Sequence, residues 1–491
     1  MKKMTKVNFV KPIHACNAAA FGEGQLGGER QNKLYNLRVA IVGTDLLGQI
    51  VLGCLYGLGI GNIYFMDDSK SYQKKDDGFL YNYEDKLLNK SKSNLVYNAL
   101  KLINPNSNTK KRHGRFCETF IYDFNPSLII DATNDPYSKE KVVGYALGFS
   151  GKAVPVISLA SNEEKGAISC YWPKKGKGRI AFEENPDLEA ICHKEFKGHR
   201  QGGFTSGLVA GLAVEDIRKY VFQYNGDDKV LNSNERIVYN IYSSSRKGLE
   251  DNVKKNYIPN NRKRKVLVVG AGALGNWLSI YLAHSCLGQI DFLDFDKAEI
   301  ENMNRQIQLR GRISEKKAKI LSDRIKEIDP YVKSKSHDGK ICDELTEEDI
   351  KKGRSRISEE VILNENYDVI FGCVDNKYAR LWLDEFCIRN KIAYIDGGSH
   401  PKAGQLAVYI PDITRSVNEQ LHLETFSEKI SNACDGPNPS VVMSNAIIAA
   451  AMCGELTHVF NYELNKHTLE GPFVYDTFFQ ERFWIERKTK R

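Results

Sequence analysis

The sequence predicts an α/β protein with two Rossmann-like, mostly parallel sheets and flanking helices, arranged as a pseudo-dimer of repeats. One strand, glycine turn, helix and strand unit occurs twice, and later elements follow it in the same order over residues 38–213 and 265–450. The length of 491 residues is also too great for a single hydrophobic core. We therefore expect two domains, residues 1–250 and 251–491, the second with a C-terminal extension.

Each repeat opens with a β-branched run, Val39–Val42 or Val266–Val269, which is typical of a strand buried on both faces in a parallel sheet. A glycine turn and an apolar helix are expected next, followed by a second strand that ends in aspartate. The expected helices span residues 46–58 and 274–287, and the second strands span 62–67 and 289–294. This order is a βαβ unit, which places the glycine turn at the carboxyl edge of the sheet.

The later elements also pair between the repeats. They are a helix that ends before a proline (102–105 and 327–330), a strand that ends in a polar loop (128–135 with 369–375), a further strand (152–157 with 391–395) and a small-residue helix (206–213 and 440–450). The polar stretch 242–264 is the expected boundary between the halves. Residues 351–360 predict a charged surface helix or loop.

The amino-acid composition argues against several classes of protein. The chain is 42% hydrophobic and 27% charged, with no evident membrane-spanning run and no apolar leader, so we expect a cytoplasmic protein without a membrane partner. Eleven cysteines without C-x-x-C spacing indicate reduced thiols rather than disulfides or structural zinc. The net charge of +8 is spread over many segments, and we therefore do not expect a nucleic-acid partner.

The intact glycine motif predicts a nucleotide site. Gly270, Gly272 and Gly275 form G-x-G-x-x-G between a buried strand and a helix, where backbone N–H groups can approach a phosphate. Asp294 follows nineteen residues later, where its carboxylate can bond a ribose hydroxyl. Both features fit dinucleotide folds equally well, so the motif alone leaves the nucleotide open.

A polar cluster after this acid favours a triphosphate. Asn302, Arg305, Gln306 and Lys317 have no clear use in hydride transfer, whereas cations there can grip a triphosphate and neutralise the pyrophosphate that leaves it. The alternative for Arg305 and Lys317 is an exposed helix face.

Asp375 ends a further strand at the same edge. With Asp294 or Asp296 across a phosphate it is a candidate magnesium ligand, since Mg²⁺ prefers carboxylate and phosphate oxygens. The alternative is a loop aspartate that makes a turn with Asn376.

Taken in order, these motifs resemble the ThiF/MoeB/HesA family, which includes the adenylation domains of ubiquitin-activating enzymes. The resemblance covers about residues 265–455 and, more faintly, 35–220. It rests on the glycine motif, Asp294-Phe-Asp296, Asn302-x-x-Arg305-Gln306, Lys317-Ala318, and Cys373-x-Asp375-Asn376 with Arg380.

The resemblance implies an enzyme that uses ATP and magnesium to adenylate a C-terminal carboxylate. The expected partner is a ubiquitin-like or sulfur-carrier protein that ends in diglycine, with a conjugating enzyme or sulfur donor as a further partner. Asp294 would hold the ribose, while Asn302, Arg305 and Lys317 would contact the phosphates, and Asp375 would bind the metal. The nucleotide-binding set is Gly270, Gly272, Gly275, Asp294, Asp296, Asn302, Arg305, Gln306, Lys317 and Asn376.

The first repeat resembles an inactive copy of the same domain. Asp67 is expected to match Asp294, and Asp135 to match Asp375, but Lys75 and Gly78 stand for Asn302 and Arg305. Asp45 replaces the middle glycine, and an acid there repels phosphate. An inactive copy before an active one resembles the core of eukaryotic ubiquitin-activating enzymes.

The roles of Cys434 and Arg30 stay open, with two alternatives for each residue. Cys434 lies where some family members keep a nucleophilic cysteine that forms a thioester, although Asp435 beside it raises a thiol's pKa. Arg30, before Gln31, is either an arginine that reaches the partner half's site or an exposed side chain.

Three other functions stay open. A related enzyme can adenylate a ribosomal peptide or a tRNA base without thioester transfer. A non-catalytic nucleotide-binding scaffold and an NAD-dependent oxidoreductase are the others. Association into a homo-oligomer is also open.

Overall fold

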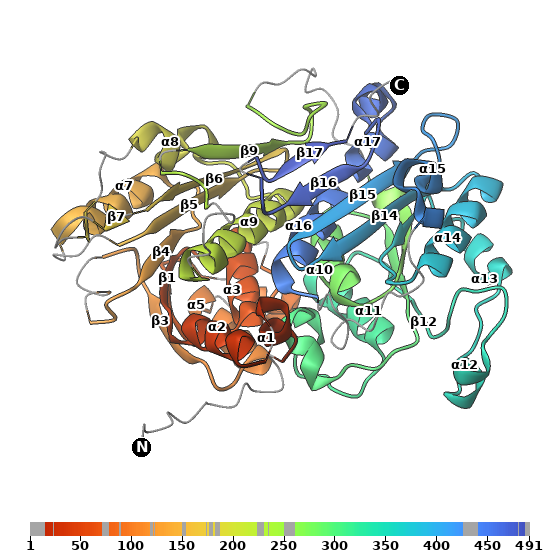
Figure 1. Cartoon of the computed structure of the whole chain (residues 1–491), viewed down its shortest axis with the longest axis horizontal. Helices are drawn as coiled ribbons and strands as arrows, with labels where there is room; N and C mark the ends of the chain where they lie inside the picture. Colours follow the sequence, from red (N-terminus) through yellow and green to blue (C-terminus); the bar gives the residue numbers. More distant parts are fainter. Residues whose placement is uncertain are drawn as a thin grey trace.

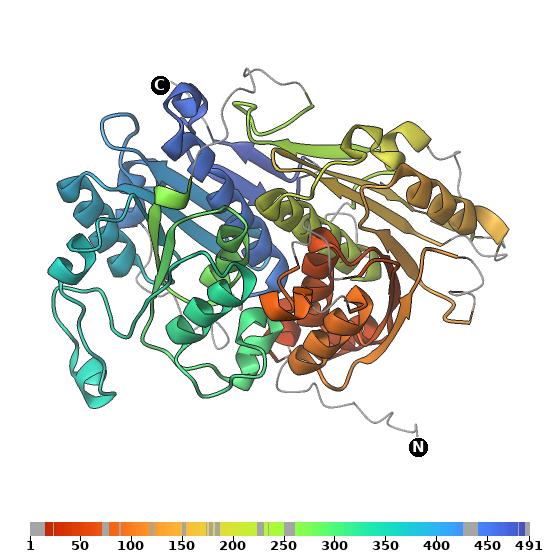
Figure 2. The ribbon, with the colours of Figure 1, turned by 180° about the vertical axis from the view of Figure 1, so that it is seen from behind.

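The protein contains two sheets that lie side by side, one from each half of the chain (Figures 1 and 2). The structure, a computed structural model, describes residues 15–22, 24–70, 78–87, 90–117, 121, 123–149, 154–172, 174–175, 180–181, 187–222, 230–233, 235–249, 261–425, 440–479 and 481–486.

The first sheet has seven strands in the order β3-β2-β1-β4-β5-β6-β9. The pairs from β3 through to β5 are parallel, whereas β5 with β6 and β6 with β9 are antiparallel. The strands are β1 (Arg38–Val42), β2 (Asn62–Asp67), β3 (Asn108–His113), β4 (Leu128–Asp131), β5 (Val156–Ser161), β6 (Lys165–Tyr171) and β9 (Arg236–Asn240). A separate two-stranded ribbon pairs β7 (Lys174–Lys175) with β8 (Ile180–Ala181).

The second sheet repeats this plan with eight strands in the order β12-β11-β10-β13-β14-β15-β16-β17. Its pairs are parallel from β12 to β14 and antiparallel from β14 to β17. The strands are β10 (Lys265–Val269), β11 (Gln289–Leu293), β12 (Ser336–His337), β13 (Val369–Gly372), β14 (Ala393–His400), β15 (Ala403–Tyr409), β16 (Phe473–Asp476) and β17 (Phe483–Ile485). The predicted pair of mostly parallel sheets with flanking helices is confirmed.

Helices cover the sheets and join their strands. They are α1 (Ala15–Phe21), α2 (Gly24–Asn36), α3 (Leu46–Leu58), α4 (Tyr83–Leu87), α5 (Lys92–Ile103), α7 (Pro136–Gly144), α8 (Leu188–Cys192), α9 (Gly203–Phe222), α10 (Ala273–Ala283), α11 (Lys317–Ile328), α12 (Glu347–Lys351), α13 (Glu359–Leu363), α14 (Lys377–Asn390), α15 (Val417–Leu421), α16 (Val442–Gly454) and α17 (Leu456–Phe460). The charged segment 351–360 links α12 to α13, and α12 projects from the body of the second half (Figure 1).

Strand register shows how closely the halves correspond. Val39 pairs with Ile63 and Leu128, as Val266 pairs with Ile290 and Val369. The same register makes Asp67 the counterpart of Asp294, as predicted.

The predicted helix bounds hold for α3 but not for α10, which ends at Ala283 rather than at residue 287. His284 and Ser285 bond back through their side chains to the carbonyls of Ile280 and Tyr281. Such local bonds compete with helix continuation. Cys286 then adopts a positive φ of 54°, which starts the turn into β11.

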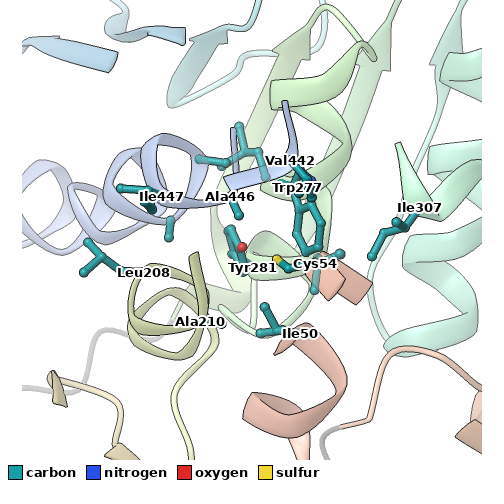
Figure 3. Close-up of a cluster of buried hydrophobic side chains, with 14 of the residues drawn as sticks. Ile50, Cys54, Leu208, Ala210, Trp277, Tyr281, Ile307, Val442, Ala446 and Ile447 are labelled. Carbon is teal, nitrogen blue, oxygen red and sulfur yellow. The ribbon is translucent and has the colours of Figure 1, made fainter. Parts of the chain in front are cut away.

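The halves meet where α9 packs against α16 (Figure 3). Small residues let α9 come close to both α16 and α10: a Cβ added at Gly211 would lie 2.5 Å from Ile447 Cγ1 of α16, and one at Gly207 would lie 2.3 Å from Tyr281 Cζ of α10. Buried side chains of four helices from both halves fill this junction, including Ile50, Cys54, Leu208, Trp277, Tyr281, Val442, Ala446 and Ile447. One apolar core therefore continues through both domains.

The segment Val442–Phe460 corrects one sequence-based expectation. By length and composition it could cross a membrane, although no such run was expected. In the structure 89% of this stretch is buried inside the protein, where α16 packs on α9, α10 and β14. A core helix passes the same test of length and composition.

Buried ion pairs also join the halves. Arg246, after β9, donates Nε and Nη2 to the two carboxylate oxygens of Glu455 at 2.9 Å each. Arg482, after the β16–β17 turn, donates to Asp216 of α9 at 2.6 Å. These four side chains are at most 2% exposed. Each pair links segments more than 200 residues apart in sequence.

Glu455→Gln should lower the free energy of unfolding by about 3–5 kcal/mol, because it leaves the buried Arg246 guanidinium without a counter-charge. Urea denaturation followed by circular dichroism measures the change. Glu348→Gln breaks a pair with Lys352 whose side chains are 72% and 53% exposed, and should cost less than about 1 kcal/mol. Equal losses in the two variants would contradict a special role for the buried pair.

Candidate active site

A cleft of about 830 Å³ opens at the carboxyl edge of the second sheet. It lies where strand order reverses between β10 and β13, the usual ligand position in open α/β sheets. Ten predicted site residues line it: Gly270, Gly272, Asp294, Asp296, Asn302, Arg305, Gln306, Lys317, Asp375 and Asn376. Of the other two, Gly275 lies behind the turn, and Cys434 falls outside the described residues.

The lack of a Cβ matters for a different physical reason at each of the three motif glycines. Gly270 has a φ of +98°, and a Cβ there would lie 2.5 Å from Cys373 O. A Cβ on Gly275 would lie 2.0 Å from Gly270 O, so this glycine lets α10 begin against the turn. A Cβ on Gly272 would meet nothing within 4 Å. Gly272 is therefore the position where a ligand, rather than the protein, can use the space beside the N-terminus of α10.

Asp294 is held at the floor of the cleft by two backbone groups. Ala271 N donates to Oδ2 and Asp296 N donates to Oδ1, both at 2.7 Å. Burial raises the pKa of this carboxyl, an effect that Lys317 opposes. The fixed carboxylate keeps further lone pairs with which to accept hydroxyl groups.

Lys317 lies at the first turn of α11, with Nζ 3.2 Å from Asp296 Oδ2. Arg354, which was not among the predicted residues, has a guanidinium nitrogen 3.8 Å from Asp296 Oδ1 and stacks 4.0 Å from the Phe295 ring centre. Asp296 is thus paired with two cations. Lys317 is one of four lysine and arginine side chains that line the cleft, with Arg305, Lys340 and Arg380, whereas Arg354 does not line it. These four cations can contact an anionic ligand.

The crossover segment, residues 294–316, joins β11 to α11 and contains two short turns, η5 (Ile300–Asn304) and η6 (Ile307–Leu309). This segment brings Asn302, Arg305 and Gln306 to the cleft. All three side chains are buried. Asn302 Oδ1 accepts a bond from Glu299 N at 3.0 Å and so shapes the segment. Burial lowers the pKa of Arg305 to about 10, so the guanidinium stays charged at neutral pH. An anion placed beside it would offset its desolvation.

Asp375 is the carboxylate best suited to a metal ion. It is exposed in the cleft and makes no hydrogen bond or ion pair with the part of the chain that the structure describes, whereas Asp294 and Asp296 are already engaged. Magnesium commonly uses one or two carboxylates plus phosphate oxygens. Within the described ranges, no three His, Cys, Asp or Glu side chains form a metal cage, which leaves Asp375 with ligand phosphates as the fitting donor set.

Asn376 has a structural task as well. Its Oδ1 accepts from Ala379 N at 2.8 Å and caps α14. The sequence left open that Asp375 is a loop residue that makes a turn with Asn376. In the structure it is Asn376 that bonds the helix turn, and Asp375 beside it stays available to a ligand.

A buried ion pair supports the cleft wall. Arg380 of α14 lies 3.3 Å from Asp396 of β14 and donates to Gly397 O at 2.9 Å. Further along, Ser399 donates to Asn445 of α16 at 2.8 Å. Sequence reasoning missed Asp396, Ser399 and Asn445, because their partners lie 16 to 46 residues away and no local motif marks them.

A scan against protein-family models matches the ThiF family over residues 17–260 and 252–491. The chain belongs to the ThiF family. The suspected resemblance is therefore confirmed for both halves.

Several relatives share this family. The chain is 28% identical over 162 residues to the tRNA threonylcarbamoyladenosine dehydratase of Haemophilus influenzae, covering 33% of this chain and 57% of that protein. It is 28% identical over 146 residues to the molybdopterin-synthase adenylyltransferase of the same organism, covering 30% and 54%. It is 28% identical over 159 residues to ubiquitin-like modifier-activating enzyme 5 of Dictyostelium discoideum, covering 32% and 41%. The chain thus spans about half the length of the relatives it matches.

Among solved structures, Escherichia coli MccB with the peptide MccA-N7isoASN matches with a TM-score of 0.34 and 18% identity. The match covers 44% of this chain and 62% of MccB.

The first ThiF-type half keeps the buried ion pair in a changed form. Lys139 stands where Arg380 stands, four residues after the cap of its helix, and donates to Leu159 O at 2.7 Å. Its acid is Asp131 of β4, at 3.3 Å. In strand register Asp131 matches Gly372, while Ser158 of β5 matches Asp396. The acidic partner of this ion pair therefore lies on β4 in the first half and on β14, the counterpart of β5, in the second half.

The same register corrects the expected match of Asp135 with Asp375. Asp135 caps α7 as Asn376 caps α14, so Asp135 corresponds to Asn376. Asn134 takes the place of Asp375, and its side chain donates to Ser161 O at 2.7 Å. The expectation was wrong because both dipeptides contain an aspartate and only strand pairing distinguishes their order.

Internal partners fill the first half's ligand positions. Asp45, in place of Gly272, pairs with the buried Lys92, which stands where Lys317 stands at the start of its helix. Gln201 accepts from Leu47 N at 2.7 Å and so occupies the N-terminal turn of α3. Ser69 replaces Asp296 and bonds Asp67 through its backbone N at 2.7 Å. The first half thus keeps a basic side chain, Lys92, at a ligand position, and the Asp45 carboxylate neutralises its charge.

Arg30 does not line the second half's cleft. Its guanidinium donates to Phe21 O and lies 5.8 Å from the Phe222 ring centre, within the first half. Gln31 donates to Leu58 O at 3.0 Å. In the structure this pair packs α2 rather than reaching the cleft. Gly78 is described, but Lys75 lies outside the described residues.

Gly275→Ala should lower the free energy of unfolding by about 1–3 kcal/mol, because the new methyl group collides with Gly270 O. Gly272→Ala should change it by less than about 0.5 kcal/mol, since that Cβ enters open space, and yet weaken nucleotide binding. Thermal unfolding and calorimetric titration with ATP separate the two effects. A Gly272→Ala variant with unchanged nucleotide affinity would contradict the assignment of this space to a ligand.

Proposed function

We propose that the chain is an adenylyltransferase that activates a C-terminal carboxylate as an acyl adenylate in the second half's cleft. One observation carries the proposal: the cleft combines an open glycine at a helix N-terminus, a set of basic side chains and one uncommitted carboxylate, Asp375. Each of these has a use with MgATP, and the family relatives named as adenylyltransferases and activating enzymes support it.

The chemistry assigns a role to each part of the cleft. Asp294 would accept ribose hydroxyls, and Gly272 with the first turn of α10 would face the phosphates. Asp375 would bind magnesium, which supplies charge neutralisation on the triphosphate. The substrate carboxylate attacks the α-phosphorus, an oxygen–phosphorus bond forms, and the bond to pyrophosphate breaks. Arg305 and Lys317 would stabilise the negative charge on the departing pyrophosphate.

The far end of the cleft suits an extended peptide tail. Ser399, Gln405, Ser440 and Asn445 line it with neutral hydrogen-bonding groups, beside the backbone of Gly397, Gly398 and Gly404. We therefore favour a ubiquitin-like or sulfur-carrier protein with a diglycine end as substrate, in the cytoplasm. A conjugating enzyme or sulfur donor would then receive the activated group. Cys434 remains the proposed thioester nucleophile in this scheme.

A second candidate rests on the relative named as a tRNA threonylcarbamoyladenosine dehydratase. An enzyme of that kind would adenylate a tRNA base or a peptide without a thioester.

Intact mass spectrometry distinguishes these functions. The protein is incubated with ATP, magnesium and either small diglycine-ending proteins or tRNA. An adenylate on the carrier supports the main proposal, and an additional thioester that disappears in Cys434→Ala supports the transfer step. A modified tRNA alone supports the second candidate. Absence of any ATP-dependent product or pyrophosphate exchange, with normal ATP binding, would favour a non-catalytic scaffold instead.

Asp375→Ala should reduce carrier-dependent ATP–pyrophosphate exchange by at least about 100-fold, because a metal ligand contributes several kcal/mol of charge stabilisation. The fold should persist, since Asp375 is exposed. Glu347→Ala removes a carboxylate that is 92% exposed and is not part of the cleft lining, and should leave exchange unchanged. Exchange above about half the wild-type rate in Asp375→Ala would refute the metal assignment.

Asp45→Gly should leave the stoichiometry at one ATP per chain in calorimetric titration. The substitution frees Lys92, but Gln201 still occupies the turn of α3 and Asn134 still replaces the metal-binding acid. Two ATP molecules per chain, in this variant or in the wild type, would contradict the proposed asymmetry.

A further inference from the structure

The first half packs directly against the segment that carries Arg305. Helix α3 approaches the backbone of Asn304 so closely that a Cβ on Gly57 would lie 2.5 Å from Asn304 O. Helix α1 contacts the same turn, η5. Because residue 57 is a glycine, its own backbone carbonyl on α3 lies close enough to η5 for a side chain to link the two.

A chain of three hydrogen bonds crosses this contact. Arg305 Nη1 donates to Asn304 Oδ1 at 2.6 Å, Asn304 Nδ2 donates to Asn17 Oδ1 at 2.9 Å, and Asn17 Nδ2 donates to Gly57 O at 2.7 Å. Asn17 and Asn304 are fully buried, and Arg305 is 3% exposed. Water therefore does not compete with these bonds.

The two ends of the chain determine its direction. A guanidinium can only donate, and a backbone carbonyl can only accept. Asn304 must therefore turn its oxygen toward Arg305 and its amide nitrogen toward Asn17, and Asn17 must do the same toward Gly57. Each amide has a single orientation that satisfies both neighbours. The carbonyl of Gly57, in the first half, thereby fixes the orientation of the Asn304 amide that bonds Arg305, whose Nη1 also donates to Glu301 O at 3.2 Å.

We infer that Asn17 is a positioning residue that holds Arg305 in place from the other half of the chain. The inference rests on the proposed function, since only there does Arg305 face the phosphates of ATP. Asn17 lines no part of the cleft and acts through Asn304. The first half would thus contribute to the reaction although its own ligand positions are filled.

The kinetic test uses Asn17→Ala in carrier-dependent ATP–pyrophosphate exchange. Loss of the relay leaves Asn304 free to turn and Arg305 misplaced, so we expect kcat/KM for ATP to fall by about ten-fold or more. KM for the carrier should change by less than two-fold, because Asn17 contacts no part of the carrier end of the cleft. A general loss of folded protein would instead lower kcat alone.

Gln31→Ala is the matched control. Gln31 is also a buried first-half amide, and it donates to Leu58 O, the carbonyl next to that of Gly57, but no bond links it to Arg305 in the described structure. The Gln31→Ala variant should lose about as much free energy of unfolding as Asn17→Ala does. Its KM for ATP should stay unchanged. Asn17→Asp is the conservative variant. In its protonated form, which burial favours, its hydroxyl donates to Gly57 O and its other oxygen accepts from Asn304, so this variant should restore at least half of the wild-type kcat/KM.

A second measurement does not depend on turnover. Arg305 is labelled with phenylglyoxal in the full-length protein and quantified by peptide mass mapping. Asn17→Ala should speed labelling of Arg305 several-fold, while Gln31→Ala should leave the rate unchanged. Equal rates in all three proteins, or equal acceleration in both variants, would overturn the inference. If the wild type shows no exchange at all, the proposed function fails, and the labelling rates still decide the relay.

Discussion

The close packing of α9 on α16 is the constraint on which the other features depend. Glycines on α9 bring helices of both halves within contact, and the shared core leaves little freedom to separate them. Buried ion pairs at Glu455 and Asp216 then join segments that are far apart in sequence. Because the junction is buried and charge-paired, the crossover segment of the second half meets a fixed surface.

The same fold has produced two different sheet edges. In the second half the space beside Gly272 is open, and Asp375 has no partner among the residues that the structure describes, so the edge can accept a charged ligand. In the first half Asp45 neutralises Lys92, and Gln201 bonds the helix turn. The strand register at this edge is the same in both halves, and a few side chains decide whether its ligand positions are open or occupied by internal partners.

Sequence patterns predicted what is local. The buried strands, the glycine turn, the bounds of α3 and the match of Asp67 with Asp294 all follow from residue patterns within one short stretch of each repeat. Ten of the twelve predicted site residues line the cleft because parallel strands end at one edge.

Features that depend on tertiary contacts could not be predicted in this way. The Asp135 match was wrong, since only strand pairing distinguishes Asn134 from Asp135. Gln201 bonds a helix 154 residues earlier, and Asn17 bonds a residue 287 positions later. For Arg30 the sequence left two environments open, because its packing against Phe222 leaves no pattern in the nearby sequence.

The buried pair at the sheet edge has a consequence for how the halves can be recombined. Lys139 takes its acid from β4, whereas Arg380 takes its acid from β14, the counterpart of β5. Grafting β13 in place of β4 would leave Lys139 with no counter-charge, and the reverse graft would place two acids beside one guanidinium. Chimeras between the repeats must therefore exchange these neighbouring strands as a unit.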